Sequence, residues 1–385
     1  MQPLIQSQDP LGVYRVGDCK FYSKLQAIEM HDKTGIHPHW DFNEAVFKSY
    51  NWTVEPKDDI RELYRQRAQQ IRDRYDYVIL MFSGGADSTN MLYSFLDNDI
   101  KIDEVACYIN YDATGDKDCF LNTEIVRVAL PLLEHLKTEH PWLKQRIIDI
   151  SQLTIDFFND NENKFSWIYE MNSLFNPNNA CRESLPLKIP DWSNLIDQGK
   201  KLCIVYANDK PRIIHHPDGR FSYRFIDILD NAATVKSMAG QQPYTDELFY
   251  WTPDKPEILI KQGHMIKRYL SQPNVQNLPF VSTKRSDLAF RQVGDTKYWL
   301  SNHGVHTIIY PKWDISTYSV GKISSNIFTE RDTWFFELDN NTPIKQNWRI
   351  GIEKLWKTIP KYWKNDPDDL SKGFVNCWSL DYFLD

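Results

Sequence analysis

The stretch Tyr75-Asp-Tyr-Val-Ile-Leu-Met-Phe82, followed by Ser83-Gly-Gly-Ala-Asp-Ser88 and Thr89-Asn-Met-Leu-Tyr-Ser-Phe-Leu96, decides the fold of this chain. The continuous apolar run from Tyr77 to Phe82 is typical of a strand that is buried on both faces, as in a parallel sheet. The apolar residues between Met91 and Leu96 recur at helical spacing, which indicates a helix packed on that sheet. The sequence therefore predicts a strand, a loop and a helix in direct succession.

The loop between this strand and helix has the composition of a phosphate-binding turn. Gly84 and Gly85 allow a tight turn that side chains would block. The turn leads into a helix N-terminus, where N–H groups without intrahelical partners and the helix dipole favour an anion. Ser83, Ser88 and Thr89 add hydroxyl donors, so we expect a phosphate cradle. A tight turn that is merely rich in glycine and serine is the alternative interpretation.

Asp87 is unusual in such a loop, because a carboxylate repels bound phosphate. Its presence makes sense if the carboxylate holds a magnesium ion or orients the loop. We therefore treat Asp87 as a candidate catalytic residue and a candidate magnesium ligand.

The loop sequence Ser-Gly-Gly-Ala-Asp-Ser resembles the PP-loop of the ATP pyrophosphatase superfamily, which is written S-G-G-x-D-S. It is not a Walker loop, because the Gly-Lys-Ser/Thr ending is missing. The resemblance implies a HUP-type (adenine nucleotide alpha hydrolase-like) fold, ATP and Mg²⁺ as cofactors, and cleavage of ATP between the α- and β-phosphates. The residues that the loop assigns to nucleotide binding are Phe82, Ser83, Gly84, Gly85, Ala86, Asp87 and Ser88.

Strand-like and helical segments alternate further along the chain, which predicts an α/β fold with a doubly wound parallel sheet. Ligands in such sheets bind outside the carboxyl ends of the strands. In PP-loop proteins the end of the second strand contacts the adenosine, which by position implies Tyr108, Asn110 and Asp112 here. The expected segments are strands over 104–109, 146–150 and 201–206, and a helix over 119–139 that Pro131 should kink.

A second polar loop, Ala207-Asn-Asp-Lys-Pro-Arg212, follows the strand predicted over 201–206. Lys210 and Arg212 are candidate catalytic residues, because their charges can neutralise a pyrophosphate leaving group. Asp209 is a candidate magnesium ligand, and both Asp209 and Lys210 are candidate nucleotide contacts. The alternative is a polar turn in which Pro211 ends the strand. The Gly-rich acidic signature of asparagine synthetases is absent from this loop.

The regions on either side of the core are expected to be accessory. We predict an N-terminal subdomain over 1–74, a PP-loop core over 75–275, and a C-terminal extension over 276–385 that caps the core or builds the acceptor site. The five arginines of a helix predicted over 58–74 indicate either a solvated face with ion pairs or a surface for a nucleic acid or nucleotide.

Several smaller elements are also predicted. Glu247, Lys261, Lys267 and Arg268 either line the substrate side or belong to a solvated face. The other expected elements are a hairpin over 13–21, a helix from Ser23 to near Gly35, a hairpin over 212–226, a helix from Pro256 to Leu270, and β-like runs at 305–310 and 334–338.

Composition and charge limit the class of protein. The formal net charge of −7 argues against a general nucleic-acid binder. No apolar run approaches the length of a membrane span, and the N-terminus has neither a basic region nor an apolar signal core. We therefore expect a cytoplasmic protein without a membrane partner. The six cysteines are scattered without a C-x-x-C pair, which favours reduced, mostly buried thiols.

The resemblance implies adenylation of a carboxylate or carbonyl oxygen by ATP, followed by amide or C–N bond formation, as in asparagine-synthase-like ligases. The cysteine motifs of sulfur-transferring and reducing relatives are absent, which disfavours their chemistry. Position 2 is Gln2 rather than a nucleophilic cysteine, so we expect no attached glutaminase domain. The layout is also similar to uncharacterised PP-loop proteins of large tailed phages.

Two other classes of function stay open. One is an enzyme that modifies a nucleic-acid or nucleotide base, with the arginine-rich helix as its docking surface. The other is a non-catalytic ATP sensor, against which the carboxylate of Asp87 argues. The sequence does not identify the acceptor, whether small molecule or nucleic acid, and it leaves a homo-oligomer open.

Overall fold

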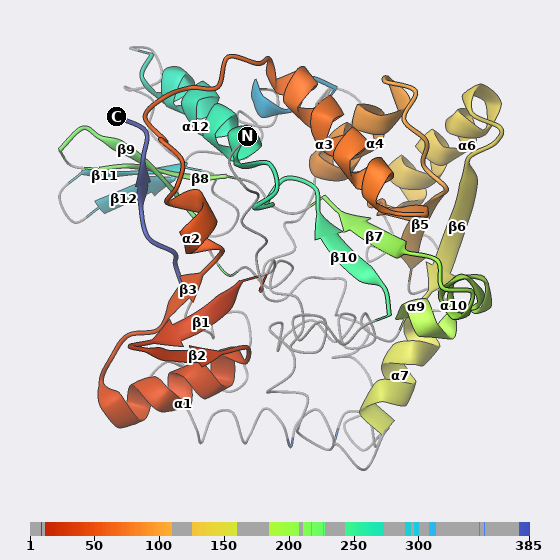
Figure 1. Ribbon diagram of the computed structural model, residues 1–385, viewed down its shortest axis with the longest axis horizontal. Coiled ribbons are helices and arrows are strands. Elements are labelled where there is room, and N and C mark those ends of the chain that lie inside the picture. Colours follow the sequence, from red (N-terminus) through yellow and green to blue (C-terminus); the bar gives the residue numbers. More distant parts are fainter. Residues whose placement is uncertain are drawn as a thin grey trace.

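A five-stranded, all-parallel sheet flanked by helices forms the centre of the computed structural model (Figure 1). It confirms the α/β class and the parallel sheet. The strands lie in the order β10 (Thr245–Leu248), β7 (Leu202–Tyr206), β4 (Tyr77–Met81), β5 (Glu104–Ile109) and β6 (Lys144–Asp149). The structure describes residues 9, 12–109, 125–159, 185–207, 211–216, 218–225, 227, 243–272, 289–293, 296–299, 308–312, 346, 350 and 377–385.

The order of the strands places β4, the first strand of this sheet along the chain, in its middle. The second and third strands, β5 and β6, follow on one side, and the fourth and fifth, β7 and β10, on the other. This is the order 3-2-1-4-5 of a doubly wound sheet, in which the chain changes direction between the first and fourth strands. The switch point of the sheet is therefore at the carboxyl ends of these two strands, here β4 and β7.

Four of the five parallel strands coincide with the predicted ones to within two residues, but β10 was not predicted. Its sequence, Thr-Asp-Glu-Leu, is too polar to give the apolar signal of a buried strand. The strand nevertheless lies at the sheet edge beside β7, with Glu247 and Leu248 buried. Contacts made by distant arginines stabilise it, as described below.

Helix α4 (Ala86–Leu96) follows the loop and packs against α3 (Ile60–Arg74), which also contacts α12 (Pro256–Leu270). These three helices were predicted. Asp59 accepts a hydrogen bond from the N–H of Arg61 at the start of α3, and Pro256 occupies the first turn of α12.

The connection from β5 to β6 contains a π-helical turn, η2 (Ile125–Ala129), which leads into α6 (Leu130–Glu139). Pro131 lies in the first turn of α6 rather than inside a continuous α-helix, which is a correction to the predicted helix over 119–139. Residues 110–124 lie outside the described part. The next helices are α7 (Ser151–Asn159), α9 (Leu185–Lys188) and α10 (Pro190–Asp197).

The N-terminal region forms a small antiparallel sheet with the order β2-β1-β3. Its hairpin turns at Gly17, which has φ of 59°, as the sequence predicted. The helix that follows begins at Ser23, whose Oγ accepts from the N–H of Gln26, and ends at Gly35. The elements are β1 (Val13–Val16), β2 (Cys19–Phe21), α1 (Lys24–Thr34), β3 (His39–Asp41) and α2 (Glu44–Phe47).

A second five-stranded sheet joins three distant parts of the chain. The predicted hairpin around Gly219 forms its centre, and the C-terminal strand pairs with one edge of that hairpin. The rings of Phe47, Trp52 and Phe225 pack together with that of Tyr382, which belongs to the C-terminal strand. The strands lie in the order β12 (Thr296–Trp299), β11 (Ala289–Val293), β8 (Arg212–His215), β9 (Phe221–Arg224) and β13 (Tyr382–Phe383).

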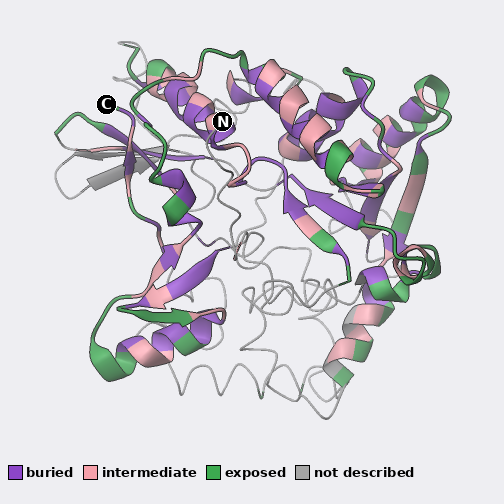
Figure 2. Cartoon of the chain, in the orientation of Figure 1, coloured by how far each residue is buried: buried purple, intermediate pink, exposed green. Residues whose placement is uncertain are grey.

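Buried residues concentrate in the inner parallel strands β4, β5 and β7, whereas the edge strand β6 and strand β2 are more exposed (Figure 2). One hydrophobic cluster includes residues of the N-terminal region, the central sheet and the C-terminal segment. Cys107, Cys203 and Cys377 are buried free thiols, and burial raises the pKa of Cys107 to about 12. No helix in the described part of the chain is long and apolar enough to cross a membrane.

The prediction of a strand over 305–310 is wrong for the residues of this run that the structure describes, which are 308–310. Ile308 and Ile309 are helical, although their β-branched side chains favour a strand. Tertiary packing decides their conformation, because Ile309 is completely buried. The run predicted at 334–338 lies outside the described residues.

Candidate functional site

The Ser83–Ser88 loop connects the carboxyl end of β4 to the first turn of α4, as predicted. The N–H of Phe82 still bonds to the carbonyl oxygen of Ala106 at 2.8 Å, so the loop begins directly at the sheet edge. β7 ends beside it, because Leu80 of β4 and Val205 of β7 are register partners. The loop therefore lies at the switch point of the doubly wound sheet.

Gly84 fixes the course of the loop for two reasons. Its φ is 78°, in the left-handed region that residues with a side chain rarely adopt. A Cβ atom at this position would also lie 2.9 Å from the backbone nitrogen of Ala129, in the π-helical turn. Glycine is therefore required here by both the turn and the close approach of η2.

The hydroxyl groups of the loop bond to one another and to its backbone. The Oγ atoms of Ser83 and Ser88 are 3.2 Å apart, and the N–H of Ser83 donates to Ser88 Oγ at 3.3 Å. Ser88 Oγ donates in turn to the carbonyl oxygen of Gly85 at 3.2 Å. The two serines thus hold the loop in a compact turn through their own hydrogen bonds.

The N-terminus of α4 has the character of an anion-binding site. Gly85 is the N-cap residue, and among the described residues no side chain caps this helix end. The first-turn N–H groups of a helix lack intrahelical partners and carry a partial positive charge. This end of α4 can therefore donate to a phosphate from its backbone.

Asp87 lies in the first turn of α4 and is held from two sides. The phenol of Tyr310 donates to Asp87 Oδ1 at 2.5 Å, and the phenol of Tyr250 donates to the backbone carbonyl oxygen of Asp87 at 2.9 Å. A carboxylate at a helix N-terminus is also favoured by the helix dipole. Asp87 therefore has a role in fixing the start of α4, whatever its role toward a ligand.

Three buried tyrosines surround this position, and sequence reasoning missed them. The rings of Tyr64 and Tyr250 have centroids 5.5 Å apart, and those of Tyr250 and Tyr310 are 5.3 Å apart. Burial raises the pKa of all three phenols, so they remain protonated donors at neutral pH. They come from α3, from the segment after β10 and from the C-terminal region, so no local spacing connects them.

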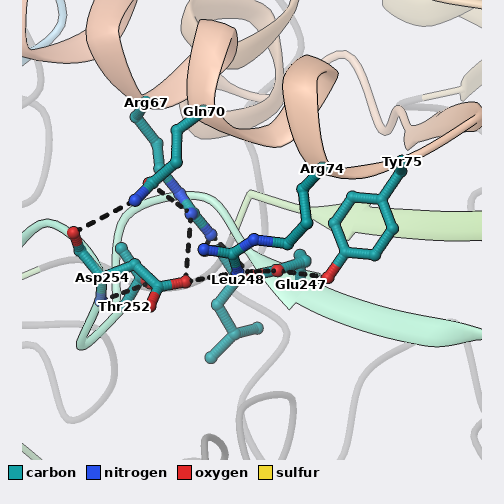
Figure 3. Close-up of polar contacts among 8 residues, drawn as sticks. All are labelled: Arg67, Gln70, Arg74, Tyr75, Glu247, Leu248, Thr252 and Asp254. Carbon is teal, nitrogen blue, oxygen red and sulfur yellow. Dashed lines mark hydrogen bonds and ion pairs between the residues drawn. The ribbon is translucent and has the colours of Figure 1, made fainter. Parts of the chain in front are cut away.

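The arginines of α3 form a second polar cluster, which we call the arginine network: Arg67, Arg72 and Arg74 with the carboxylates of Glu247, Asp254 and Asp103 (Figure 3 shows its β10 side). Arg67 is completely buried, and its Nη2 atom donates to Glu247 Oε2 at 2.7 Å and to the carbonyl oxygen of Leu248 at 2.9 Å. Arg74 reaches Glu247 Oε1 at 2.9 Å and Asp254 Oδ2 at 2.6 Å. This network fixes the edge strand β10 to α3.

The contacts of the α3 arginines distinguish a solvated face with ion pairs from a docking surface for a nucleic acid or nucleotide. Arg65 pairs with Glu62 on the surface, as expected for a solvated face, whereas Arg67 is buried and Arg72 pairs with Asp103 at 2.5 Å. Arg67 and Arg72 are thus engaged inside the protein, whereas Arg74 forms its ion pairs with Glu247 and Asp254 at the surface. This pairing argues against the use of these three side chains as a docking surface.

The residues considered for a substrate side are likewise engaged elsewhere. Glu247 belongs to the arginine network, and Lys261 pairs with Glu55 at 2.9 Å. The remaining pairs are Lys267 with Asp385 and Arg268 with Glu55. For the three basic residues, which lie on α12, these ion pairs favour the interpretation as a partly solvated helix face, whereas Glu247 is buried in β10 and fits neither interpretation.

The other predicted site residues are distributed as follows. Phe82 and Ala86 are buried, and Tyr108 is half-buried near the carboxyl end of β5. Arg212 is buried at the start of β8, in the second sheet rather than in the parallel sheet that carries the loop. Asn110, Asp112, Asp209 and Lys210 lie outside the described part of the chain.

A metal centre made entirely of protein ligands is absent from the described part, where no group of three or more His, Cys, Asp and Glu side chains is placed to hold an ion. Asp87 does provide a carboxylate, the ligand type that Mg²⁺ prefers. Mg²⁺ is commonly bound by one or two carboxylates together with substrate phosphates. The pair of Asp87 and Asp209 as magnesium ligands stays a prediction.

A polar cleft of about 330 Å³ lies between α3, α4 and residues 311–312. Arg61, Arg65 and Lys312 contribute positive charges to it, while Asp59, Glu62 and Asp97 contribute negative ones. Because these charges balance, the cleft lacks the electropositive character of a phosphate site.

Comparison with known proteins adds no relative. No protein-family model matches this chain, and a search of curated proteins finds no match.

Proposed function

We propose that this chain is an ATP-dependent adenylating enzyme of the PP-loop ATP pyrophosphatase type, with a HUP-like core. The observation that carries the proposal is the place of the Ser83–Ser88 loop at the switch point of the parallel sheet. This is where doubly wound sheets bind nucleotides. The positive φ of Gly84 and the helix end without a side-chain cap further support a phosphate-binding role.

In this proposal the loop backbone and the hydroxyls of Ser83 and Ser88 bind the phosphates of ATP. Mg²⁺ neutralises phosphate charge when bound, and Asp87 would hold it, with Asp209 as a second proposed ligand. Lys210 and Arg212 are proposed to neutralise the departing pyrophosphate. An oxygen of the acceptor attacks the α-phosphorus, the bond from that phosphorus to the bridging oxygen breaks, and pyrophosphate leaves. A nitrogen nucleophile then attacks the activated carbon, and AMP leaves with the acceptor oxygen.

The first test is to incubate the protein with Mg²⁺ and α-labelled ATP, together with pooled metabolites or RNA as a source of acceptor. We expect AMP and pyrophosphate as products. ADP and phosphate would contradict the proposed bond cleavage. Fractionating the pool would then identify the acceptor.

Asp87→Asn is the sharpest variant for this test. Its amide oxygen can still accept from the phenol of Tyr310, but the carboxylate charge is lost. We expect folding to persist, but the affinity for ATP in Mg²⁺ should fall by about 10-fold or more, and turnover should fall at least about 100-fold, as for loss of a carboxylate that holds the metal ion. Full turnover by this variant would show that Asp87 has only a structural role.

A non-catalytic ATP sensor is the second candidate, and the contact of Asp87 with Tyr310 favours it. This contact gives the carboxylate a structural reason to be present, independent of catalysis. ATP binding without cleavage, across every acceptor fraction, would favour the sensor over the enzyme.

A further inference from the structure

The segment at residues 308–312 belongs to the C-terminal region, yet it lies along α4. Tyr310 contacts Asp87 in the first turn of that helix, and Lys312 Nζ lies 2.8 Å from Asp97 Oδ2 at the other end. The phenol of Tyr64 on α3 donates to the carbonyl oxygen of Ile309 at 2.7 Å. The segment is therefore fixed against the helix that begins at the loop.

The contact between Tyr310 and Asp87 is buried and directional. The side chain of Tyr310 is completely buried, and the ring of Tyr250 packs against it. A hydrogen bond from a neutral phenol to a carboxylate is among the stronger ones in proteins, particularly away from water. It therefore restricts the orientation of the Asp87 carboxylate.

The backbone of Asp87 is held by a different tyrosine. Tyr250 donates to the carbonyl oxygen of Asp87 and accepts from Asn90 Nδ2 at 3.0 Å, one turn further along α4. Tyr250 thus fixes where the residue lies, while Tyr310 fixes how its carboxylate is turned. Only the second contact acts on the group that would meet a metal ion.

We propose that Tyr310 is a positioning residue of the nucleotide site, which holds the Asp87 carboxylate in the orientation that serves Mg²⁺-bound ATP. This inference rests on the proposed function, because it assigns a partner to the carboxylate used there. It makes the C-terminal region part of the site, through a residue 223 positions from Asp87 in the chain.

Tyr310→Phe tests the inference, because it keeps the buried ring and removes only the hydroxyl group. Tyr64→Phe is the matched control, since it removes the hydroxyl that binds the same segment through Ile309 but leaves the bond to Asp87. The measurement is the affinity for ATP by titration calorimetry, in Mg²⁺ and again in excess chelator. Thermal unfolding of both variants records any general loss of structure.

We expect Tyr310→Phe to weaken binding of ATP in Mg²⁺ by about 10-fold or more, as is typical when the partner of a metal-ligating carboxylate is removed. In excess chelator, the affinity of Tyr310→Phe for ATP should stay within about twofold of the wild-type value. The affinity of Tyr64→Phe for ATP should stay within the same range both in Mg²⁺ and in chelator. Equal behaviour of the two variants, or an unchanged Mg²⁺ effect in Tyr310→Phe, would overturn the positioning role. Failure of the wild type to bind ATP in either condition would instead refute the proposed function, and this inference with it.

Discussion

The loop of Ser83–Ser88 and the arginine network are both polar and partly buried, but they satisfy their polar groups in opposite ways. In the network, Glu247 meets Arg67, Arg74 and the phenol of Tyr75, so positive and negative charges neutralise each other within the protein. At the loop, the N-terminus of α4 has no side-chain cap among the described residues. The charged side chains of the arginine network therefore stabilise the fold, whereas the backbone N–H groups at the start of α4 are suited to binding an external anion.

Glu247→Ala should cause the greatest loss of stability, because it removes the central carboxylate of the arginine network. The substitution leaves Arg67 completely buried without its nearest carboxylate, and removing one partner of a buried pair costs about 3–5 kcal/mol. We expect this loss in the free energy of unfolding, measured by urea denaturation. ATP affinity of the folded protein should be unchanged, because the network does not include the loop.

Glu247→Gln serves as the control for that variant. It keeps the size of the side chain and an oxygen that accepts from Arg67, so its loss of stability should be smaller. If either variant lost ATP binding while remaining folded, the arginine network would be shown to affect the Ser83–Ser88 loop as well as the stability of the fold.

Gly84→Ala should cause a smaller loss of stability, and Gly199→Ala is its control. Both glycines have φ near 75°, and a side chain there costs roughly 1–2 kcal/mol. At Gly84 the new Cβ atom would meet backbone, at 2.9 Å from the nitrogen of Ala129, whereas no atom of the described residues lies within 4 Å of a Cβ atom at Gly199. The additional strain should destabilise Gly84→Ala by about 1–3 kcal/mol beyond the control.

ATP affinity provides the functional readout for the same pair of variants. Gly84→Ala should weaken binding because the loop must shift, while Gly199→Ala should bind as the wild type does. Equal stabilities of the two variants would show that η2 can move away from the loop, and that the close approach does not constrain it.

The parts of the molecule that the sequence predicts well are those whose signals are local. The strand, loop and helix around Ser83 follow from one apolar run, two glycines and one helical repeat. Strand β10 lacked such a signal, because the charge of the buried Glu247 is neutralised by arginines that lie 180 and 173 residues earlier. The contact of Tyr310 with Asp87 was missed for the same reason, since tertiary packing alone brings the two residues together.

Asp103 is the carboxylate of the arginine network that pairs with Arg72, and its replacement should cost the least stability. Burial alone would raise the pKa of Asp103, but Lys101, Arg72 and the N–H of Val78 outweigh it and lower the pKa below its usual range. We expect Asp103→Asn to cost about 1–2 kcal/mol of stability at neutral pH, as for loss of a hydrogen-bonded charge. The measurement is urea denaturation of wild type and variant between pH 7 and pH 2.

The pH dependence identifies the ion pair as the cause of that loss. Because the pKa of Asp103 is lower in the folded state, the unfolded chain takes up the proton first as the pH falls below about 4. The contribution of Asp103 is therefore complete above that pH and is lost as the pH falls through the folded pKa. The stability gap between wild type and Asp103→Asn should be constant from pH 7 to 5 and narrow below pH 4. A gap that stayed constant to pH 2 would mean that the side chain acts through packing, and that charge pairing at this end of α3 contributes nothing to the fold.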